Sequence, residues 1–226
     1  MYKKFKEKTM KQAKGFTGKE NHNITQAEVV EFTKNFQNLF ASNSAPGGFF
    51  DKAAVTALIQ QENAVGMRYY YGVDQDNKTG LLLSGTDCNR NDLVDGEPVK
   101  RSILNPPLAK EGTYNPNAVD HKVSTELAAE LTANYREQND SGQPIGGFFG
   151  KQAVLRVINQ KNCIGLRFYY GADENGIRVI CLMGVDQNGK DMFDGYLAEM
   201  SSWCPPYCGV LNFLNSNVFS TVEILS

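Results

Sequence analysis

An internal repeat constrains this chain more than any other feature of its sequence. The phrase GGFFDKAAV begins at Gly47, and GGFFGKQAV begins at Gly146, 99 residues further along. The same offset, without a gap, aligns the identical pairs His22 and His121, Arg68 and Arg167, Tyr70 and Tyr169, Asp74 and Asp173, and Asp92 and Asp191. Solenoid repeats are shorter, with periods of about 20–50 residues. The sequence therefore predicts the internal duplication of a small domain.

The two copies share one order of expected elements. In the first copy, apolar residues spaced by three and four predict a helix over Thr25–Leu39, with Thr25 and Glu28 as a capping box. A short helix over Asp51–Gln61 and strands over Val65–Val73 and Gly80–Thr86 follow. The second copy gives Ser124–Tyr135, Gly150–Gln160, Ile164–Ala172 and Ile177–Val185. This order predicts an α+β fold, an internal duplication of a helix-helix-strand-strand module with antiparallel sheets and pseudo-two-fold symmetry.

The repeat also sets the expected domain boundaries. They are a basic N-terminal extension over residues 1–20, copy one over 21–110, copy two over 119–209 and a strand-like tail over 210–226. The GGFF phrase is expected to be a joint, where two glycines redirect the chain and two phenylalanines enter the core. Because a helix is expected directly after each phrase, an anion site at the helix N-terminus stays an alternative.

The charge distribution bears on partners and location. A net charge of −2 gives no overall field that would recruit nucleic acid. Lysines crowd residues 1–20, which is typical of a solvated terminus and leaves open a docking arm for an acidic partner. No apolar run is long enough for membrane insertion, and no signal-peptide pattern follows the lysines. A cytoplasmic location is therefore expected.

Two equivalent strand faces carry the candidate ligand-binding residues. Two-residue alternation places Arg68, Tyr70 and Asp74 on one face of the first strand of copy one. The matching residues of copy two are Arg167, Tyr169 and Asp173. Each arginine is expected to pair with a carboxylate on the next strand, such as Asp87 or Asp186. The alternative is a small-ligand or peptide site.

Turns rich in aspartate and asparagine suggest a test for calcium. Segments such as DQDNKTG (residues 74–80) and DQNGKDMFDG (residues 186–195) space their oxygen donors by two. None fits the EF-hand loop, because the glycine comes early and the closing glutamate is missing. Tight turns use the same residues. We expect no cofactor and no metal, with calcium as a minor alternative.

The phrase CPPYC contains Cys204 and Cys208. Its counterpart in copy one is NPPLA, Asn105–Ala109, so the diproline belongs to the scaffold and the cysteines do not. The spacing fits neither a zinc site nor a thioredoxin motif. Packed thiols, a local disulfide, and a metal or redox pair all stay open. The odd total of five cysteines argues against a secreted module built on disulfides.

The C-terminal tail has the alternation of a strand. Val218, Val222 and Ile224 lie on one side and Phe219 on the other, and this strand pairs either with its own sheet or with a neighbouring molecule. No nucleophile motif, metal cluster or nucleotide fingerprint is visible, so an enzyme with an unrecognised site is the least favoured function. We expect a non-catalytic structural or interaction protein that self-assembles through sheet edges and this strand. The alternative is a small-ligand, peptide or anion-binding module.

Several phrases together resemble a group of uncharacterised bacterial proteins. They are Gly146–Ala153, the strand Gly165–Gly171, the turn Gly184–Gly189 and the cysteine pair Cys204–Cys208. The resemblance covers copy two better than copy one, which lacks the cysteines. It implies a bacterial origin and no functional residue.

Overall fold

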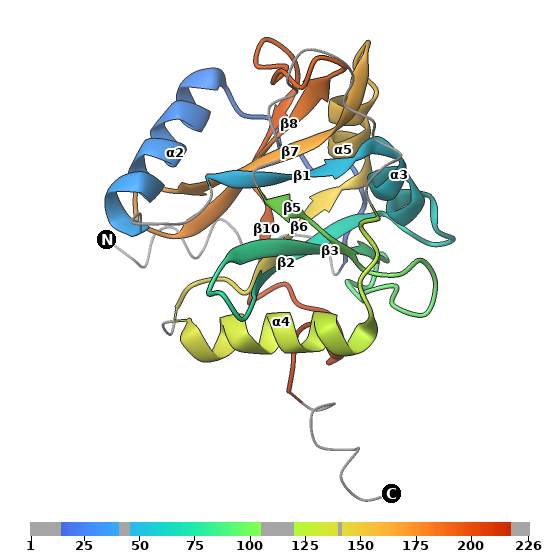
Figure 1. Cartoon of the computed structure of the whole chain (residues 1–226). Helices are drawn as coiled ribbons and strands as arrows, with labels where there is room; N and C mark the ends of the chain where they lie inside the picture. Colours follow the sequence, from blue (N-terminus) through green and yellow to red (C-terminus); the bar gives the residue numbers. More distant parts are fainter. Residues whose placement is uncertain (1–14, 41–45, 105–119, 140–141, 218–226) are drawn as a thin grey trace, which may run out of the picture.

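The computed structural model describes residues 15–40, 46–104, 120–139 and 142–217. Within these residues the chain forms four helices and two five-stranded antiparallel sheets (Figure 1). Strands follow the order β5-β1-β7-β8-β9 in one sheet and β10-β6-β2-β3-β4 in the other. The predicted α+β fold with antiparallel sheets is confirmed.

All four expected helices are present, with ends close to those predicted. They are α2 (Gln26–Phe40), α3 (Lys52–Gln60), α4 (Thr125–Gln138) and α5 (Lys151–Ile158). The capping box before α2 forms, since Thr25 N donates to Glu28 Oε2 at 2.7 Å and Glu28 N donates to Thr25 Oγ1 at 3.2 Å. Such reciprocal bonds satisfy N–H groups that a helix leaves unpaired at its start.

Two long hairpins form the centres of the sheets. One joins β2 (Gly66–Val73) to β3 (Thr79–Thr86), and the other joins β7 (Cys163–Ala172) to β8 (Arg178–Asp186). In the first turn, Asp74 Oδ1 accepts the backbone N–H groups of Asp76 and Lys78 at 3.1 and 2.9 Å. Asp173 Oδ1 makes the matching bonds in the second turn. Aspartate side chains therefore fix both predicted turns.

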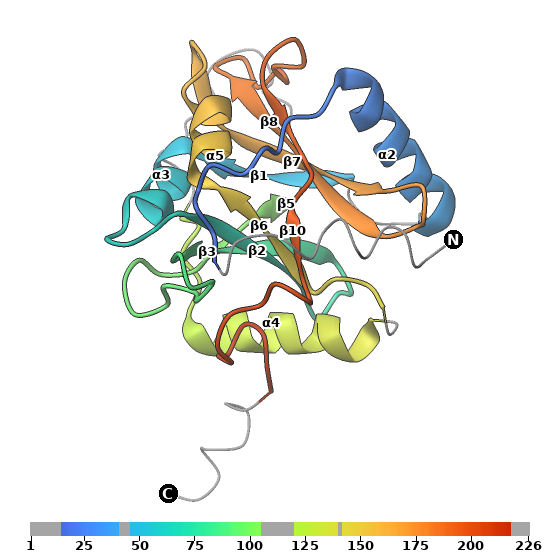
Figure 2. The ribbon, with the colours of Figure 1, turned by 180° about the vertical axis from the view of Figure 1, so that it is seen from behind.

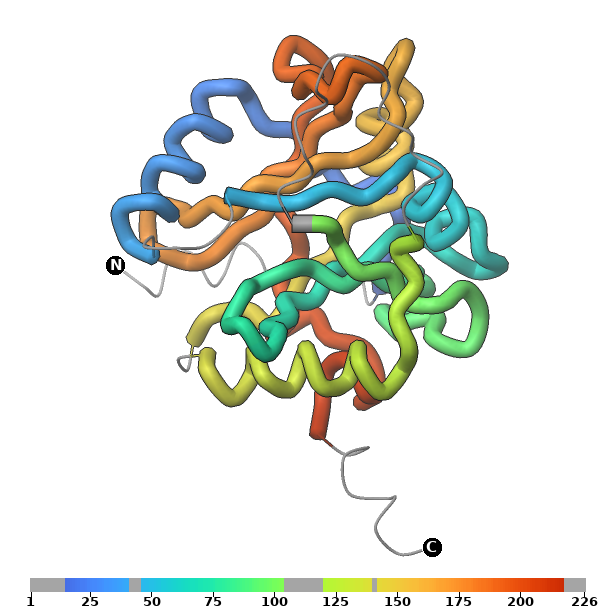
Figure 3. The backbone as a smooth tube through the Cα atoms, in the orientation of Figure 1, coloured from blue at the N-terminus to red at the C-terminus, as the bar shows by residue number. Residues whose placement is uncertain are grey.

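The GGFF phrases are strands, so the predicted redirection of the chain by the glycines is wrong, while the predicted burial of the phenylalanines in the core is confirmed. They form β1 (Gly47–Asp51) and β6 (Gly146–Gly150). β1 pairs with β7, where Gly47 lies opposite Tyr169, and β6 pairs with β2, where Gly146 lies opposite Tyr70. Each half of the chain thus contributes its GGFF strand to the sheet built on the hairpin of the other half, a crossing that can be followed along the tube in Figure 3.

Close approach between strands explains the paired glycines. A Cβ on Gly48 would lie 2.7 Å from the ring of Phe168, and one on Gly147 would lie 2.8 Å from Ser201 Oγ. A Cβ on Gly47 or on Gly146 would meet a backbone carbonyl of the neighbouring strand. None of these four glycines has a positive φ. They are required because there is no space for a side chain, and not because the chain turns.

Short strands form the edges of both sheets. They are β4 (Lys100–Arg101), β5 (Ile103–Leu104), β9 (Leu197–Ala198) and β10 (Ser202–Cys204). β5 and β10 occupy matching places, because Leu104 lies opposite Gly48 and Trp203 lies opposite Gly147. Edges of two or three residues present few unpaired backbone groups to another chain.

The two long helices and the two sheets stack in the order α2, sheet, sheet and α4, while α3 and α5 contribute apolar residues to the core between the sheets (Figures 1 and 2). The main core lies between the sheets and is rich in aromatic rings, among them Tyr69, Tyr71, Phe149, Phe168 and Tyr170. α2 packs on β7 and α4 packs on β2, each on the face of its sheet that is turned away from that core. Like the GGFF strands, each long helix therefore packs on the hairpin of the other half.

Two buried histidines join the halves through matching hydrogen bonds. His22 Nε2 accepts the N–H of Gly150 at 3.0 Å, and its Nδ1 lies 2.9 Å from Met200 O. His121 Nε2 accepts the N–H of Asp51 at 3.1 Å, and its Nδ1 lies 2.9 Å from the carbonyl oxygen of Arg101. The contacts recur at the 99-residue offset of the repeat. Descent of the two halves from one duplicated domain stays a prediction.

The start of α5 is not a free anion site. Lys151 N donates to Val65 O at 2.8 Å, and Gln152 N donates to Gly18 O at 2.9 Å. With Gly150 N bound to His22, the N–H groups that would face an anion already have protein acceptors. These bonds argue against an anion site at this helix, and the anion alternative suggested by the sequence stays a prediction.

Three predicted features lie outside the described residues. They are the lysine-rich residues 1–14, the diproline segment Asn105–Ala109, and the assembly strand with Val218, Phe219, Val222 and Ile224. The acidic partner of the lysine-rich start stays a prediction.

Candidate functional site

A buried cluster of arginine, tyrosine and aspartate lies on the sheet that contains β2. Arg68 and Tyr70 extend from β2, and Asp92 follows β3 in the chain. Asp92 Oδ1 lies 3.1 Å from Arg68 Nε, an ion pair without the alignment of a hydrogen bond. Asp92 Oδ2 accepts the Tyr70 hydroxyl at 2.6 Å. We call Arg68, Tyr70 and Asp92 the closed cluster, because the side chains of Arg68 and Asp92 are 0% exposed.

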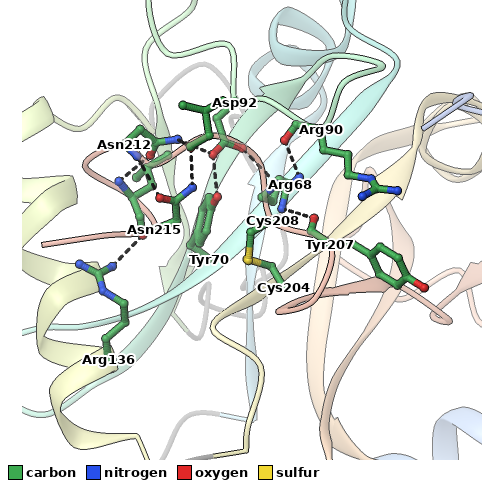
Figure 4. The surroundings of a disulfide bond; sticks show 12 residues. Arg68, Tyr70, Arg90, Asp92, Arg136, Cys204, Tyr207, Cys208, Asn212 and Asn215 are labelled. Carbon is green, nitrogen blue, oxygen red and sulfur yellow. Dashed lines mark hydrogen bonds and ion pairs between the residues drawn. A yellow bond between two sulfur atoms is a disulfide. The ribbon is translucent and has the colours of Figure 1, made fainter. Parts of the chain in front are cut away.

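Residues 204–217, the covering segment, close this cluster (Figure 4). Arg68 Nη1 donates to the carbonyl oxygen of Tyr207 at 2.8 Å, and Asn212 Nδ2 donates to Asp92 Oδ2 at 2.8 Å. The cluster thus binds a peptide segment through one backbone carbonyl and one side-chain amide. Both bonds involve a charged group, and such bonds are stronger than neutral ones.

Two further features hold the covering segment in place. Arg136 of α4 donates to Leu214 O at 2.7 Å and to Ser216 O at 3.0 Å. Cys204 and Cys208 are joined by a disulfide, with their Cα atoms 4.7 Å apart. Of the alternatives that the sequence left open for these cysteines, the structure contains the local disulfide. It constrains the loop that carries Tyr207, since a cross-link limits the conformations of the residues between its ends.

Electrostatics favour a structural role for the closed cluster. Burial raises the pKa of Asp92, and Arg68, Tyr70 and Asn212 oppose this by stabilising the charged carboxylate. Burial also raises the pKa of Tyr70 well above its usual value, so the hydroxyl stays a hydrogen-bond donor. Every charged partner is engaged within the chain, and the cluster is sealed from solvent.

The second cluster lies at the equivalent place on the sheet that contains β7. Arg167 Nη1 lies 2.7 Å from Asp191 Oδ1, and the Tyr169 hydroxyl donates to Asp191 Oδ2 at 2.6 Å. The side chains of Arg167 and Asp191 are 11% and 24% exposed. Burial, together with the bond to Asp191, raises the pKa of Tyr169 to about 12. We call Arg167, Tyr169 and Asp191 the open cluster.

The two clusters differ in what covers them. In the described part of the chain, no backbone carbonyl takes the place on Arg167 that Tyr207 O takes on Arg68, and no amide donates to Asp191 as Asn212 does to Asp92. Residues 105–118, which stand at the 99-residue offset from the covering segment, lie outside the described residues. Within the described residues, the open cluster is a partly exposed copy of a group that holds a peptide segment elsewhere in the same molecule.

The structure changes the carboxylate partners that the sequence predicted. Asp87 does not pair with Arg68, because its Oδ1 accepts the backbone N–H groups of Asn89 and Asn91, both at 2.8 Å. Asp186 has the same role in the other half. Asp74 and Asp173 also fix turns and lie outside both clusters. The predicted partners are wrong. Identity across the repeat does not single out the true ones, because Asp87 and Asp186 are an identical pair just as Asp92 and Asp191 are.

These turns also account for the residues that suggested calcium. The aspartates at their starts accept backbone N–H groups, as tight turns require. Over the ranges that the structure describes, no group of three or more histidine, cysteine, aspartate or glutamate residues could hold a metal ion.

Glu199 is a buried carboxyl group in the core. It is 3% exposed, and its Oε1 has no hydrogen-bond partner among the described residues. Burial is the main cause that raises the pKa of Glu199 to about 7; the charges of Asp173 and Glu28 act in the same direction, and the backbone N–H groups of Met200 and Ser201 oppose it. The folded protein therefore favours the protonated form of Glu199.

Glu199→Gln should make the protein more resistant to rising pH. The carboxyl group has a pKa near 7 when folded and 4.5 as a model compound, so its contribution to stability falls as pH rises from 4.5 through 7. The variant should gain about 2–3 kcal/mol over the wild type between pH 5 and pH 8, measured by urea denaturation. His22, whose pKa is lowered by burial, titrates in both proteins and cancels in the difference. The exposed control Glu174→Gln should show no such gain. The prediction would be contradicted if the free energy of unfolding changed with pH equally in the wild type and both variants.

Comparisons with protein-family models, curated proteins and solved structures find no match for this chain. Among the described residues, no helix is long and apolar enough to cross a membrane. The argument for function therefore rests on the two clusters.

Proposed function

We propose that this protein is a non-catalytic interaction protein that binds a looped peptide segment at the open cluster. One observation supports this proposal above all: the closed cluster, built from the same three residue types at equivalent positions, holds the covering segment of the chain itself. A partly exposed arginine-aspartate pair offers a donor and an acceptor, which a backbone carbonyl and a side-chain amide of a looped segment can satisfy.

The proposal assigns separate roles to the residues of the open cluster. Arg167 donates to a ligand carbonyl, and Asp191 accepts from a ligand N–H group. Tyr169 holds the Asp191 carboxylate in place through its 2.6 Å hydrogen bond. The ligand supplies the contacts that the closed cluster receives from its own chain, and because both charged groups are largely buried, these contacts are shielded from water.

Selection of peptides from a random display library tests this function. Sequences enriched on the full-length protein should fail to bind Arg167→Met and should bind Arg167→Lys weakly, since lysine lacks the planar guanidinium. The matched control is Lys161→Met, which removes an exposed positive charge from the same half and should leave binding unchanged. Thermal melting checks that each variant is folded. Failure to enrich any sequence, or equal enrichment on Arg167→Met, would overturn the proposal.

Self-assembly and location stay predictions of the sequence. The two- and three-residue edge strands offer little for edge-to-edge pairing, so we place the interaction at the open cluster instead. A cytoplasmic location was expected, but the Cys204–Cys208 disulfide favours an oxidising compartment, where such bonds persist.

A further inference from the structure

The covering segment indicates which ligand chemistry an arginine-tyrosine-aspartate cluster of this kind selects. Its two polar contacts come from the carbonyl oxygen of Tyr207 and the side-chain amide of Asn212, five residues later. The amide shares Asp92 Oδ2 with the Tyr70 hydroxyl, which lies 2.6 Å from that oxygen. A carboxylate oxygen accepts more than one hydrogen bond, so the tyrosine and the ligand amide do not compete.

The corresponding acceptor in the open cluster is already oriented. Asp191 Oδ2 accepts the Tyr169 hydroxyl at the same 2.6 Å, and Asp191 Oδ1 is held by Arg167 at 2.7 Å. A negatively charged acceptor selects for an N–H donor and against a carboxylate, since a second negative charge would be repelled. An asparagine or glutamine side chain satisfies this requirement, and an aspartate or glutamate side chain does not.

Differences between the halves show which parts of the covering segment carry over to the open cluster. Arg90 lies over the ring of Tyr207 at 5.1 Å, but its counterpart at the 99-residue offset is Gly189. Arg136, which binds the end of the covering segment, corresponds to Gln37. The open cluster therefore retains the groups that bind the carbonyl and the amide, and it lacks those that bind the aromatic ring and the segment end.

Resting on the proposed function, we infer that the open cluster selects a looped peptide with a free backbone carbonyl and, five residues later, a carboxamide side chain, because a turn such as that of the covering segment brings two such groups to neighbouring side chains. The carbonyl binds Arg167 and the carboxamide binds Asp191. An aromatic side chain on the ligand residue whose carbonyl binds Arg167 should add little affinity. The reason is that Gly189 occupies the position equivalent to Arg90.

A synthetic peptide of residues 203–217, with its disulfide formed, is the probe. Its fluorescence anisotropy is measured against the full-length protein, whose own covering segment occupies the closed cluster. The peptide should bind, and Asn212→Leu in the peptide should weaken binding at least tenfold, because Asp191 then loses a charge-assisted hydrogen bond. Asn212→Asp should weaken it further. Tyr207→Ala, the matched control, should change binding less than threefold.

Protein variants separate failure of the inference from failure of the proposed function. Asp191→Asn should erase the difference between the Asn212 peptide and its leucine variant, while Arg167→Lys should weaken both peptides. If the Asn212 peptide and its leucine variant bind equally well, and both need Arg167, the inferred preference for a carboxamide is wrong and the proposed function stands. If no peptide binds unless residues 105–119 are replaced by a glycine-serine linker, the chain occupies its own cluster and both proposals are overturned.

Discussion

The chain, cut between Leu104 and Asp120, should yield two fragments that fold only together. Each fragment lacks the partner of its GGFF strand, because β1 pairs with β7 and β6 pairs with β2. Each also lacks the hairpin on which its long helix packs, since α2 lies on β7 and α4 on β2. Exposed apolar faces and unpaired strands make the separate fragments unfolded or aggregated. No cooperative melting transition is expected from either fragment alone.

Mixed or co-expressed fragments should form a one-to-one complex with the circular dichroism of the intact protein. Its stability depends on concentration, because cutting the connection turns an intramolecular contact into a bimolecular one. With an effective concentration on the order of millimolar for linked segments, the micromolar complex should be less stable by about 4 kcal/mol. Size-exclusion chromatography with light scattering measures the stoichiometry. A single fragment that melts cooperatively as a monomer would contradict the exchanged architecture.

Arg68→Met should destabilise the protein by about 3–5 kcal/mol, since it leaves the Asp92 carboxylate buried without its counter-charge. The side chains of both residues are 0% exposed, so no water replaces the lost partner. The carbonyl oxygen of Tyr207 loses its 2.8 Å donor as well, which loosens the covering segment. For a chain of 226 residues this corresponds to a fall in melting temperature of roughly 10 °C.

The open cluster provides the matched control for this variant. Arg167→Met removes the equivalent guanidinium, but the Asp191 side chain is 24% exposed and stays hydrated, so the expected loss is about 1–2 kcal/mol. Adding Asp92→Asn to Arg68→Met should restore part of the lost stability, because the unpaired charge is then absent. Urea denaturation measures all three variants. If Arg68→Met and Arg167→Met lost equal free energies of unfolding, the difference in burial between the two clusters would have no effect on stability.

Local sequence signals predicted the secondary structure well. The capping box of Thr25 and Glu28, the apolar spacing of the helices and the aspartates of the hairpin turns each act within a few residues, so each is visible in the sequence alone. The GGFF strands were missed because a run of four small and aromatic residues has no periodicity that separates a strand from a turn. Their partners lie in the other half of the chain, and no local feature identifies them.

The candidate site was predicted only in part. Alternation along a strand placed Arg68 with Tyr70, and Arg167 with Tyr169, and both pairs share clusters in the structure. The true carboxylate partners were not predicted, since Asp92 and Asp191 reach the arginines through the path of the loop after each hairpin. Nothing local distinguishes them from the aspartates that fix turns.

The sequence by itself determined the repeat, the helices, the hairpins and the residues that line each strand face. These properties depend on periodicity, capping and turn chemistry, whose range is a few residues. Only the tertiary structure decided that the halves exchange their GGFF strands and long helices, and that, among the described residues, only the Arg68 cluster has a covering segment. The reason is that strand partners and covering segments are selected by packing between distant parts of the chain. Two nearly identical local sequences therefore acquire different surroundings.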